Sequence, residues 1–319
     1  MLGASNSSFK RMPPAPLNSG VRFVPDIIVN WKAAVSVLVV AALGFATFAC
    51  LVRYRLDRLL FPEVPGFSTA AIVATISAEP TTSSRMLVRA YGTGRLGCVV
   101  FFPGQHGGVA TYERTLFPLL VAQGVRVFAA SYPGQDGAPG RASIAEVNIF
   151  ASKAVALVTS DCGSKHTLVL GRSLGAMVAA YATGHNPVAG LILVSAAPSL
   201  SSAIDAQVRS HWYFYPFRML HARSLLRRDY SLTQALRSSA VVPVLVFQGA
   251  QDQQTSLEPL RSGFPLPRWA CIIAVPGGTH QDTYIVASGA IMVAVKSFLH
   301  RSKPNSSFEA DAAVTQLQR

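Results

Sequence analysis

A serine between two glycines is the first residue of this chain whose setting suggests chemistry. The segment Gly171-Arg-Ser173-Leu-Gly175 follows an apolar run and precedes a second, helix-like apolar run. This G-x-S-x-G pattern in a strand–turn–helix context places a serine on a tight turn at the end of a sheet. The glycines leave room where a Cβ would clash with neighbouring backbone. The start of the following helix carries a partial positive charge, which favours negative charge that develops near the serine. The alternative is an ordinary strand-to-helix turn, but the context favours a nucleophile at Ser173.

A nucleophilic serine needs a general base, and two of the seven histidines are well placed to act as one. His106 and His280 each follow a predicted strand, at the edge of the sheet where Ser173 would lie. His280 stands in the glycine-rich loop 276–282 after the last predicted strand, which leaves its imidazole free to reach the serine. We therefore predict His280 as the base.

The base in turn needs a carboxylate that fixes its tautomer and stabilises its cation. Asp252 follows the predicted strand before the His280 strand, so the chain order is Ser173, Asp252, His280. Asp205 and Asp282 are alternatives, although Asp282 lies so near His280 in sequence that it could hardly meet the ring nitrogen. We predict Asp252 as the acid.

Backbone amides near the serine could stabilise an oxyanion. The glycine-rich loop 103–108 follows a central strand, and the expected donors are the N–H groups of Gln105 and Leu174. The side chain of His106 would add a donor, or would cap the next helix. A simple strand-to-helix loop is the alternative.

The elements that must position these residues alternate along the chain. Apolar strands followed by helices predict an α/β fold with a mostly parallel sheet covered on both faces. The expected strands are 72–77 and 86–91 at the edge, then 97–102, 125–131, 167–171, 191–195, 244–247 and 272–275, and the expected helices are 111–123, 143–158, 174–184 and 282–299.

A segment without charge precedes this domain. Residues 33–52 would span about 30 Å as a helix, the thickness of bilayer hydrocarbon. The predicted interfacial anchors are Trp31, Lys32, Arg53 and Tyr54. The alternatives are a core helix, or a cleaved signal peptide, for which the basic region is far too long. We expect a mobile basic tail over 1–32, one transmembrane helix over 33–52 and a polar tail over 301–319.

Charge and cysteine usage narrow the function class. The chain has 319 residues, half of them hydrophobic, and a net charge of +13 from scattered basic residues. This pattern excludes bulk disorder and does not suggest nucleic acid as a partner. It suits an anionic membrane surface or substrate. Cysteines are few, far apart and without a CxxC pair, so we predict neither a disulfide framework nor a metal site, and the chemistry requires no cofactor.

The motifs together resemble the α/β-hydrolase superfamily from about Leu59 to Leu299. Within it the chain is similar to the membrane-anchored, serine aminopeptidase-like group, which includes lysophospholipases, monoacylglycerol lipases and acyl-protein thioesterases. The resemblance rests on six segments: Arg58-Leu-Leu-Phe-Pro62, FFPGQHGG, Ser131-Tyr-Pro-Gly134, GRSLGA, GAQD and GGTHQDTY. It implies an α/β-hydrolase domain over 59–300 with a small cap insertion over about 198–240.

Two departures from the relatives lie beside the expected acyl pocket. Pro103-Gly-Gln-His-Gly107 stands where relatives often have His-Gly-Asn-Ala-Gly, and Ser131-Tyr-Pro-Gly134 stands for Asp-Tyr-Arg-Gly. His106 and Tyr132 are therefore expected to contact substrate. In the cap, an aromatic segment over 211–217 would suit an acyl chain, and four arginines would suit an anionic head group: Arg218, Arg223, Arg227 and Arg228. The alternative is a packed cap helix whose arginines face solvent or lipid head groups.

These features predict a membrane-anchored serine hydrolase that cleaves a carboxylic ester or thioester, of lipid-like acyl character, through an acyl-enzyme. A serine peptidase-like hydrolase and a catalytically silent binding protein of the same fold are the alternatives. Basic residues on the two sides of the anchor nearly balance, and we expect the domain on the extracytoplasmic side.

Overall fold

The computed structural model describes residues 31–66, 68–79, 82–106, 108–210, 212, 221–226, 229–238, 242–262, 267 and 269–300. The chain divides into two compact units, Met1–Thr47 and Phe48–Arg319. The predicted tails at residues 1–30 and 301–319 lie outside the described residues.

One long helix, α1, spans Trp31–Leu60. It is long and apolar enough to cross a membrane, with a mean hydropathy of 2.5 over its most apolar window. The helix does not end where the uncharged run ends at Val52, but continues through Arg53 to Leu60. Its last residues, from Phe48 onward, belong to the second compact unit.

The second unit is built on one sheet of eight strands, as the sequence predicted. The strands are β1 (Ile72–Ile76), β2 (Met86–Tyr91), β3 (Gly97–Phe102), β4 (Val125–Ser131), β5 (Thr167–Arg172), β6 (Gly190–Val194), β7 (Val244–Gly249) and β8 (Ala270–Val275). Their order is β1-β2-β4-β3-β5-β6-β7-β8, and the pairs from β4 to β8 are parallel. Strand β2 pairs antiparallel with both β1 and β4. The expectation of two edge strands was wrong for β2, which lies between β1 and β4.

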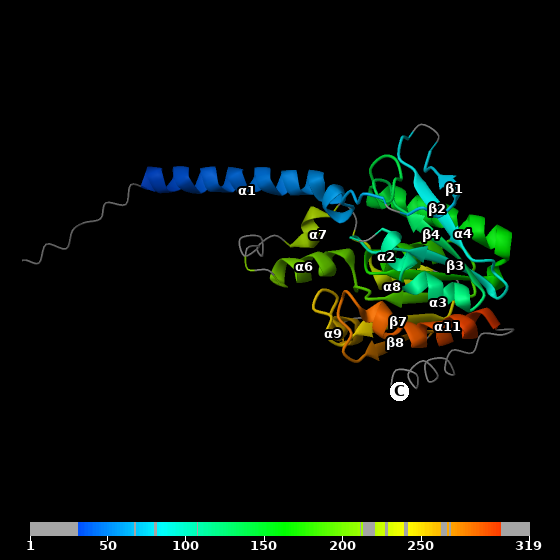
Figure 1. Ribbon diagram of the computed structural model, residues 1–319. Helices are drawn as coiled ribbons and strands as arrows, with labels where there is room; N and C mark the ends of the chain where they lie inside the picture. The colour runs from blue at the N-terminus through cyan, green and yellow to red at the C-terminus, as the bar shows by residue number, and fades with distance from the viewer. Residues whose placement is uncertain are drawn as a thin grey trace, which may run out of the picture. The chain divides into compact units, whose positions relative to one another are not determined.

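Helices cover both faces of the sheet (Figure 1). Side chains of β3 alternate between the two faces, as the period of a strand requires: Val100 and Phe102 face one core, whereas Val99 and Phe101 face the other. The first core includes residues of α4 (Ile144–Cys162), α5 (Leu174–Thr183) and α8 (Leu232–Ser238). The second includes residues of α3 (Leu116–Ala122), α10 (Thr283–Val286) and α11 (Ser288–His300).

The predicted helix over 111–123 is in fact two helices, α2 (Ala110–Glu113) and α3. Pro118 explains the break, because a proline in a helix lacks an N–H donor and its ring clashes with the carbonyl four residues earlier, here Arg114. The chain therefore leaves the helix at Arg114 and starts a new one at Leu116.

The insertion between β6 and β7 contains α6 (Leu200–Ser210), α7 (Ala222–Leu225) and α8. Two carboxylates fasten its parts together. Asp205 accepts a hydrogen bond from the backbone N–H of Ala222 at 3.1 Å, and Asp229 accepts from the hydroxyl of Ser201 at 2.6 Å. Most of the aromatic segment 211–217 lies outside the described residues.

The prediction of no disulfide was wrong. Cys98, at the start of β3, is bonded to Cys162, at the end of α4, with the two Cα atoms 6.3 Å apart. The two cysteines are 64 residues apart in sequence, and the packing of α4 on the sheet brings them together. The bond ties the amino end of β3 to α4, at the opposite end of that strand from Phe102 and the loop that follows it.

Candidate active site

Ser173 stands on a strained turn between β5 and α5. Its backbone has φ +53° and ψ −120°, a conformation that non-glycine residues adopt only where the surroundings enforce it. The flanking glycines allow this turn: a Cβ on Gly171 would collide with the carbonyl of Gly175, and a Cβ on Gly175 would collide with that of Phe102. The sequence G-x-S-x-G is thus required by backbone packing at this point.

The loop after β8 brings His280 to the serine. The Oγ of Ser173 and the Nε2 of His280 are 2.9 Å apart, within hydrogen-bond distance. On the other side of the ring, Nδ1 lies 2.9 Å from Oδ2 of Asp252 and 3.3 Å from the hydroxyl of Thr255. Ser173, His280 and Asp252 therefore form one continuous hydrogen-bonded chain, the arrangement that an activated hydroxyl nucleophile requires.

Asp252 is held by several donors besides His280. Its Oδ1 accepts from the backbone N–H groups of Gln254 at 2.9 Å and Thr255 at 2.8 Å, and its Oδ2 accepts from the hydroxyl of Thr255 at 2.7 Å. Burial opposes the charge of Asp252, but the bond to His280 and those from Thr255 outweigh it and lower the pKa of the carboxyl. The group is therefore an ionised, fixed acceptor for the His280 ring.

The two alternative carboxylates have other partners. Asp282 accepts from the backbone N–H and the hydroxyl of Thr279, both at 2.7 Å, and these bonds lower its pKa. Asp205 joins α6 to α7, as described above. The geometry therefore favours Asp252 as the partner of His280.

The expected oxyanion donors belong to two segments beside Ser173. Leu174 is the first residue of α5, where backbone N–H groups have no acceptor within the helix. The loop that carries Gln105 is fixed at several points. The backbone carbonyl of Gln105 accepts a hydrogen bond from the side chain of Gln135 at 3.1 Å, and the side-chain amide of Gln105 donates to the carbonyl of Leu59, at the end of α1. Further along the loop, the N–H of Val109 donates to buried Asp136 at 2.7 Å.

A cavity of about 680 Å³ opens onto Ser173 and His280. The polar residues of its wall include Gln105 and His106, whereas most other wall residues are apolar: Phe48, Val52, Leu56, Leu59, Leu60, Leu174, Met177, Ala197, Leu200, Ala203, Ile204, Val208, Ala222 and Leu225. His106 therefore lies where a substrate contact was predicted, and burial together with the charge of His280 lowers its pKa. Such a volume and lining suit an apolar ligand.

Tyr132 does not line this cavity. Its side chain is fully buried, and its hydroxyl donates to the carbonyl of Pro103 at 3.1 Å. The predicted substrate contact is thus a support for the loop that carries Gln105.

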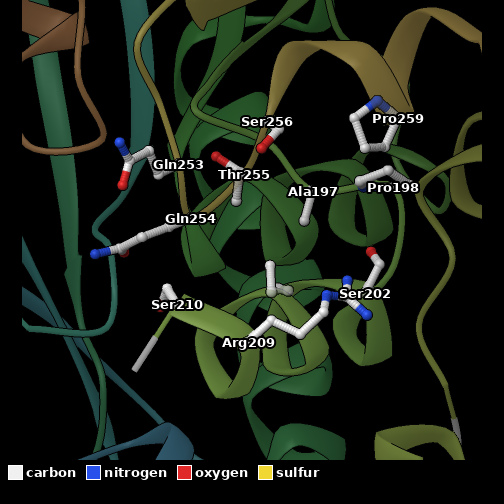
Figure 2. Close-up of a pocket in the computed structure, with 12 residues that line it drawn as sticks. Ala197, Pro198, Ser202, Arg209, Ser210, Gln253, Gln254, Thr255, Ser256 and Pro259 are labelled. Atoms are coloured by element: carbon white, nitrogen blue, oxygen red, sulfur yellow. The ribbon is translucent and has the colours of Figure 1, made fainter. Parts of the chain in front are cut away.

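A second, more polar cavity of about 390 Å³ adjoins the first and shares Ala197, Ala203, Gln254 and Thr255 with it. Figure 2 shows its wall, in which Ser202 and Arg209 of α6 stand opposite the loop from Gln253 to Ser256. Of the four arginines proposed for an anionic head group, Arg223 is exposed on α7 and lines neither cavity. Arg218, Arg227 and Arg228 lie outside the described residues.

One residue that sequence reasoning missed is Arg172, next to the serine. Its guanidinium donates to the carbonyls of His280 at 2.7 Å and Gln281 at 3.3 Å and to the hydroxyl of Tyr112 at 3.1 Å. It also lies 5.2 Å from the ring centre of Tyr284. Arg172 thereby ties the His280 loop to the strand that carries Ser173. The available signal was a charged side chain at the end of a buried strand.

A parallel sheet with a serine on a strained turn after β5, and a histidine and a carboxylate in loops after β8 and β7, defines an α/β-hydrolase architecture. The sequence model of the Alpha/beta hydrolase family matches residues 99–313. The chain therefore belongs to the alpha/beta hydrolase family. No curated protein matches it in a sequence search.

Solved structures show the same fold at low identity. An esterase from Pyrococcus furiosus superposes with a TM-score of 0.59 at 17% identity, covering 75% of this chain and 96% of its own. A candidate non-heme bromoperoxidase from Mycobacterium tuberculosis superposes with a TM-score of 0.50 at 17% identity, covering 75% of this chain and all of its own. At such identities the likeness establishes the fold and not the substrate.

Proposed function

We propose that this protein is a membrane-anchored serine hydrolase that cleaves a carboxylic ester or thioester with a lipid-like acyl group. The observation that carries the proposal is the hydrogen-bonded chain Ser173–His280–Asp252, whose first two members line a largely apolar cavity. Membership of a hydrolase family supports the reaction class. The esterase among the structural neighbours agrees with it at the level of the fold.

The geometry suits a two-step reaction. The Ser173 hydroxyl gives its proton to Nε2 of His280 while its oxygen bonds to the acyl carbon. His280 then returns the proton to the departing alcohol or thiol as its bond to the acyl carbon breaks, which leaves an acyl-enzyme. A water molecule, deprotonated by His280, releases the acid and restores the serine. Asp252 remains ionised throughout and stabilises the imidazolium.

The N–H groups of Gln105 and Leu174 are the proposed donors to the oxyanion of both tetrahedral intermediates. The fixed position of the Gln105 loop supports this role, because donors held in place before the reaction cost no reorganisation during it. In addition, Ser173 is the N-cap of α5 and Leu174 its first residue, so the positive end of that helix lies beside the same charge.

The membrane anchor in this proposal is α1, by virtue of its length and hydropathy. We place the domain on the extracytoplasmic side, in agreement with the expectation from the sequence. The Cys98–Cys162 bond supports this side, because disulfides persist in oxidising compartments and are rare in the cytosol. Protease accessibility in sealed vesicles of right-side-out orientation tests it: digestion of the domain by protease added outside is expected, and protection there would reverse the orientation.

Hydrolysis of an ester and thioester panel by the purified full-length protein tests the activity. The expected result is turnover that His280→Ala reduces by roughly 10⁴-fold or more, the scale of losing one member of such a unit. The matched control is His185→Ala, since His185 is exposed after the far end of α5. Equal turnover in the His280→Ala variant would refute the proposed base, and peptide hydrolysis without ester hydrolysis would assign the alternative substrate class.

A further inference from the structure

The end of the anchor helix forms part of the wall of the substrate cavity. Phe48, Val52, Leu56, Leu59 and Leu60 all line it, and we call these residues the α1 wall. Phe48, Val52, Leu56 and Leu60 are four residues apart, which places them along one face of a helix. All five belong to the compact unit that also holds Ser173.

Exposed residues alternate with the α1 wall along the same helix. Arg53, Arg55 and Arg58 are exposed, as are Leu51 and Tyr54. Basic and aromatic residues at this point in a chain are typical of the membrane–water interface. The last turns of α1 therefore present apolar side chains to the cavity and carry three exposed arginines beside them.

Phe48 and Val52 belong at once to the uncharged run over 33–52 and to the cavity wall. Phe48 precedes Arg53, the first charged residue after the run, by five positions, or about 7 Å along a helix axis. If the run spans the bilayer, part of the cavity wall lies at the depth of the hydrocarbon.

The same helix end is also connected to the loop beside Ser173. The side-chain amide of Gln105 donates to the carbonyl of Leu59, and the side chain of Gln135 donates to the carbonyls of both Pro62 and Gln105, at 3.5 Å and 3.1 Å. The α1 wall is thus fastened to the proposed oxyanion loop.

From this juxtaposition we propose that the cavity accepts the acyl chain of a membrane lipid ester, which passes from the bilayer to Ser173 along the α1 wall. The proposal rests on the proposed hydrolase function and adds the source and the binding mode of the substrate. An apolar chain that moves from the bilayer into this cavity along the α1 wall stays in contact with apolar side chains, so it does not have to pass through water.

The first test fills the cavity from the helix side. Val52→Trp places a large ring in the α1 wall, whereas Leu51→Trp makes a similar change at the preceding residue, which is 55% exposed and does not line the cavity. Both variants, in the full-length protein in phospholipid vesicles, are compared on a dodecanoyl ester and on the acetyl ester of the same alcohol. Fluorophosphonate labelling measures whether the site remains folded and reactive.

The expected result is that Val52→Trp lowers the ratio of kcat/KM for the dodecanoyl ester to kcat/KM for the acetyl ester at least tenfold, while the protein is still labelled. Leu51→Trp should leave this ratio at the wild-type value. Equal behaviour of the two variants would overturn the inference, as would an equal loss of both esters with Val52→Trp. If the wild-type protein neither hydrolyses esters nor is labelled, the proposed function itself fails and the inference with it.

A second measurement does not depend on a substitution. A fluorophosphonate with a long alkyl chain that ends in a diazirine is bound at Ser173 in vesicles and then illuminated. Cross-links within Phe48–Leu60 are expected. Cross-links confined to other elements would overturn the proposed path of the chain.

Kinetics in vesicles test the bilayer as the source. The rate of dodecanoyl ester hydrolysis should follow the mole fraction of ester in the vesicle and stay constant when vesicle lipid and ester are diluted together. A rate that follows the bulk concentration would show entry from water and contradict the proposal.

Discussion

Replacement of Arg172 should lower kcat, because this residue holds the loop that carries His280. Replacement by Met keeps a long side chain beside Tyr284 but removes the donors to the carbonyls of His280 and Gln281. A hydrogen bond from a charged group contributes about 1.5–3 kcal/mol. If the position of His280 depends on it, Arg172→Met should lower kcat by about tenfold to 150-fold.

The effect should fall on kcat and on the rate of fluorophosphonate labelling, because Arg172 positions the base and does not line the substrate cavity. KM should change little. Arg172→Lys keeps the charge and one donor but not the planar fork, so its activity should lie between those of Arg172→Met and the wild-type protein. A merely structural role would lower the melting temperature without this split or this partial rescue.

The matched control is Arg126→Met. Arg126 also lies over an aromatic ring, 4.7 Å from the centre of Phe128, and pairs with Asp161 at 3.3 Å on the surface. Its removal should leave kcat unchanged. Wild-type kcat and labelling in Arg172→Met would refute the argument that Arg172 holds the His280 loop.

Three further predictions concern the carboxylates and the disulfide. Asp252→Asn should lower kcat by roughly 10⁴-fold, because a neutral amide neither fixes the tautomer nor stabilises the imidazolium, whereas Asp282→Asn should have a mild effect; the reverse order in ester kinetics would transfer the role to Asp282. Because the pKa of Asp252 is lowered in the folded protein, its carboxylate stabilises the fold at any pH above the ordinary pKa of 3.8, and this stability is lost as the pH falls through the folded-state pKa. Between about pH 5 and about pH 3 the melting temperature of the wild-type protein should therefore drop more than that of Asp252→Asn. Parallel curves for the two proteins would contradict the assignment. Replacing Cys98 and Cys162 together by Ala should cost about 4 kcal/mol of unfolding free energy, on the order of 10 °C, with kcat at room temperature retained; equal melting curves for the oxidised protein and the variant would contradict a bond in the folded state.

The fold and the proximity of Ser173, His280 and Asp252 were predictable because the sequence signals for them are local. Each strand of the parallel sheet is a short apolar run, and the turn around Ser173 needs glycines at fixed spacings that can be seen in the sequence. The choice of Asp252 over Asp282 also followed from chain geometry. A residue so near His280 caps its own loop, whereas a residue at the end of the adjacent strand meets the ring.

The features that sequence reasoning missed depend on packing between distant segments. The Cys98–Cys162 bond requires α4 to lie on the first face of the sheet, and no spacing rule connects the two residues. Tyr132 was assigned to the substrate from its place in a motif, but the strand direction sends its ring into the core. The α1 wall did leave a signal: apolar residues four apart from Phe48 to Leu60 continue past Arg53 and Arg55, the first charges after the uncharged run.

The central claim, that Ser173 is an activated nucleophile, is tested most directly by mapping a covalent adduct. The full-length protein is treated with a fluorophosphonate and digested, and the modified peptide is identified by mass spectrometry. Ser195 offers a matched control, because it also has a positive φ, +52°, at the end of the neighbouring strand β6, but it is fully buried. We predict an adduct on Ser173 that disappears in Ser173→Ala and persists in Ser195→Ala. An adduct on another residue, or undiminished labelling of Ser173→Ala, would contradict it.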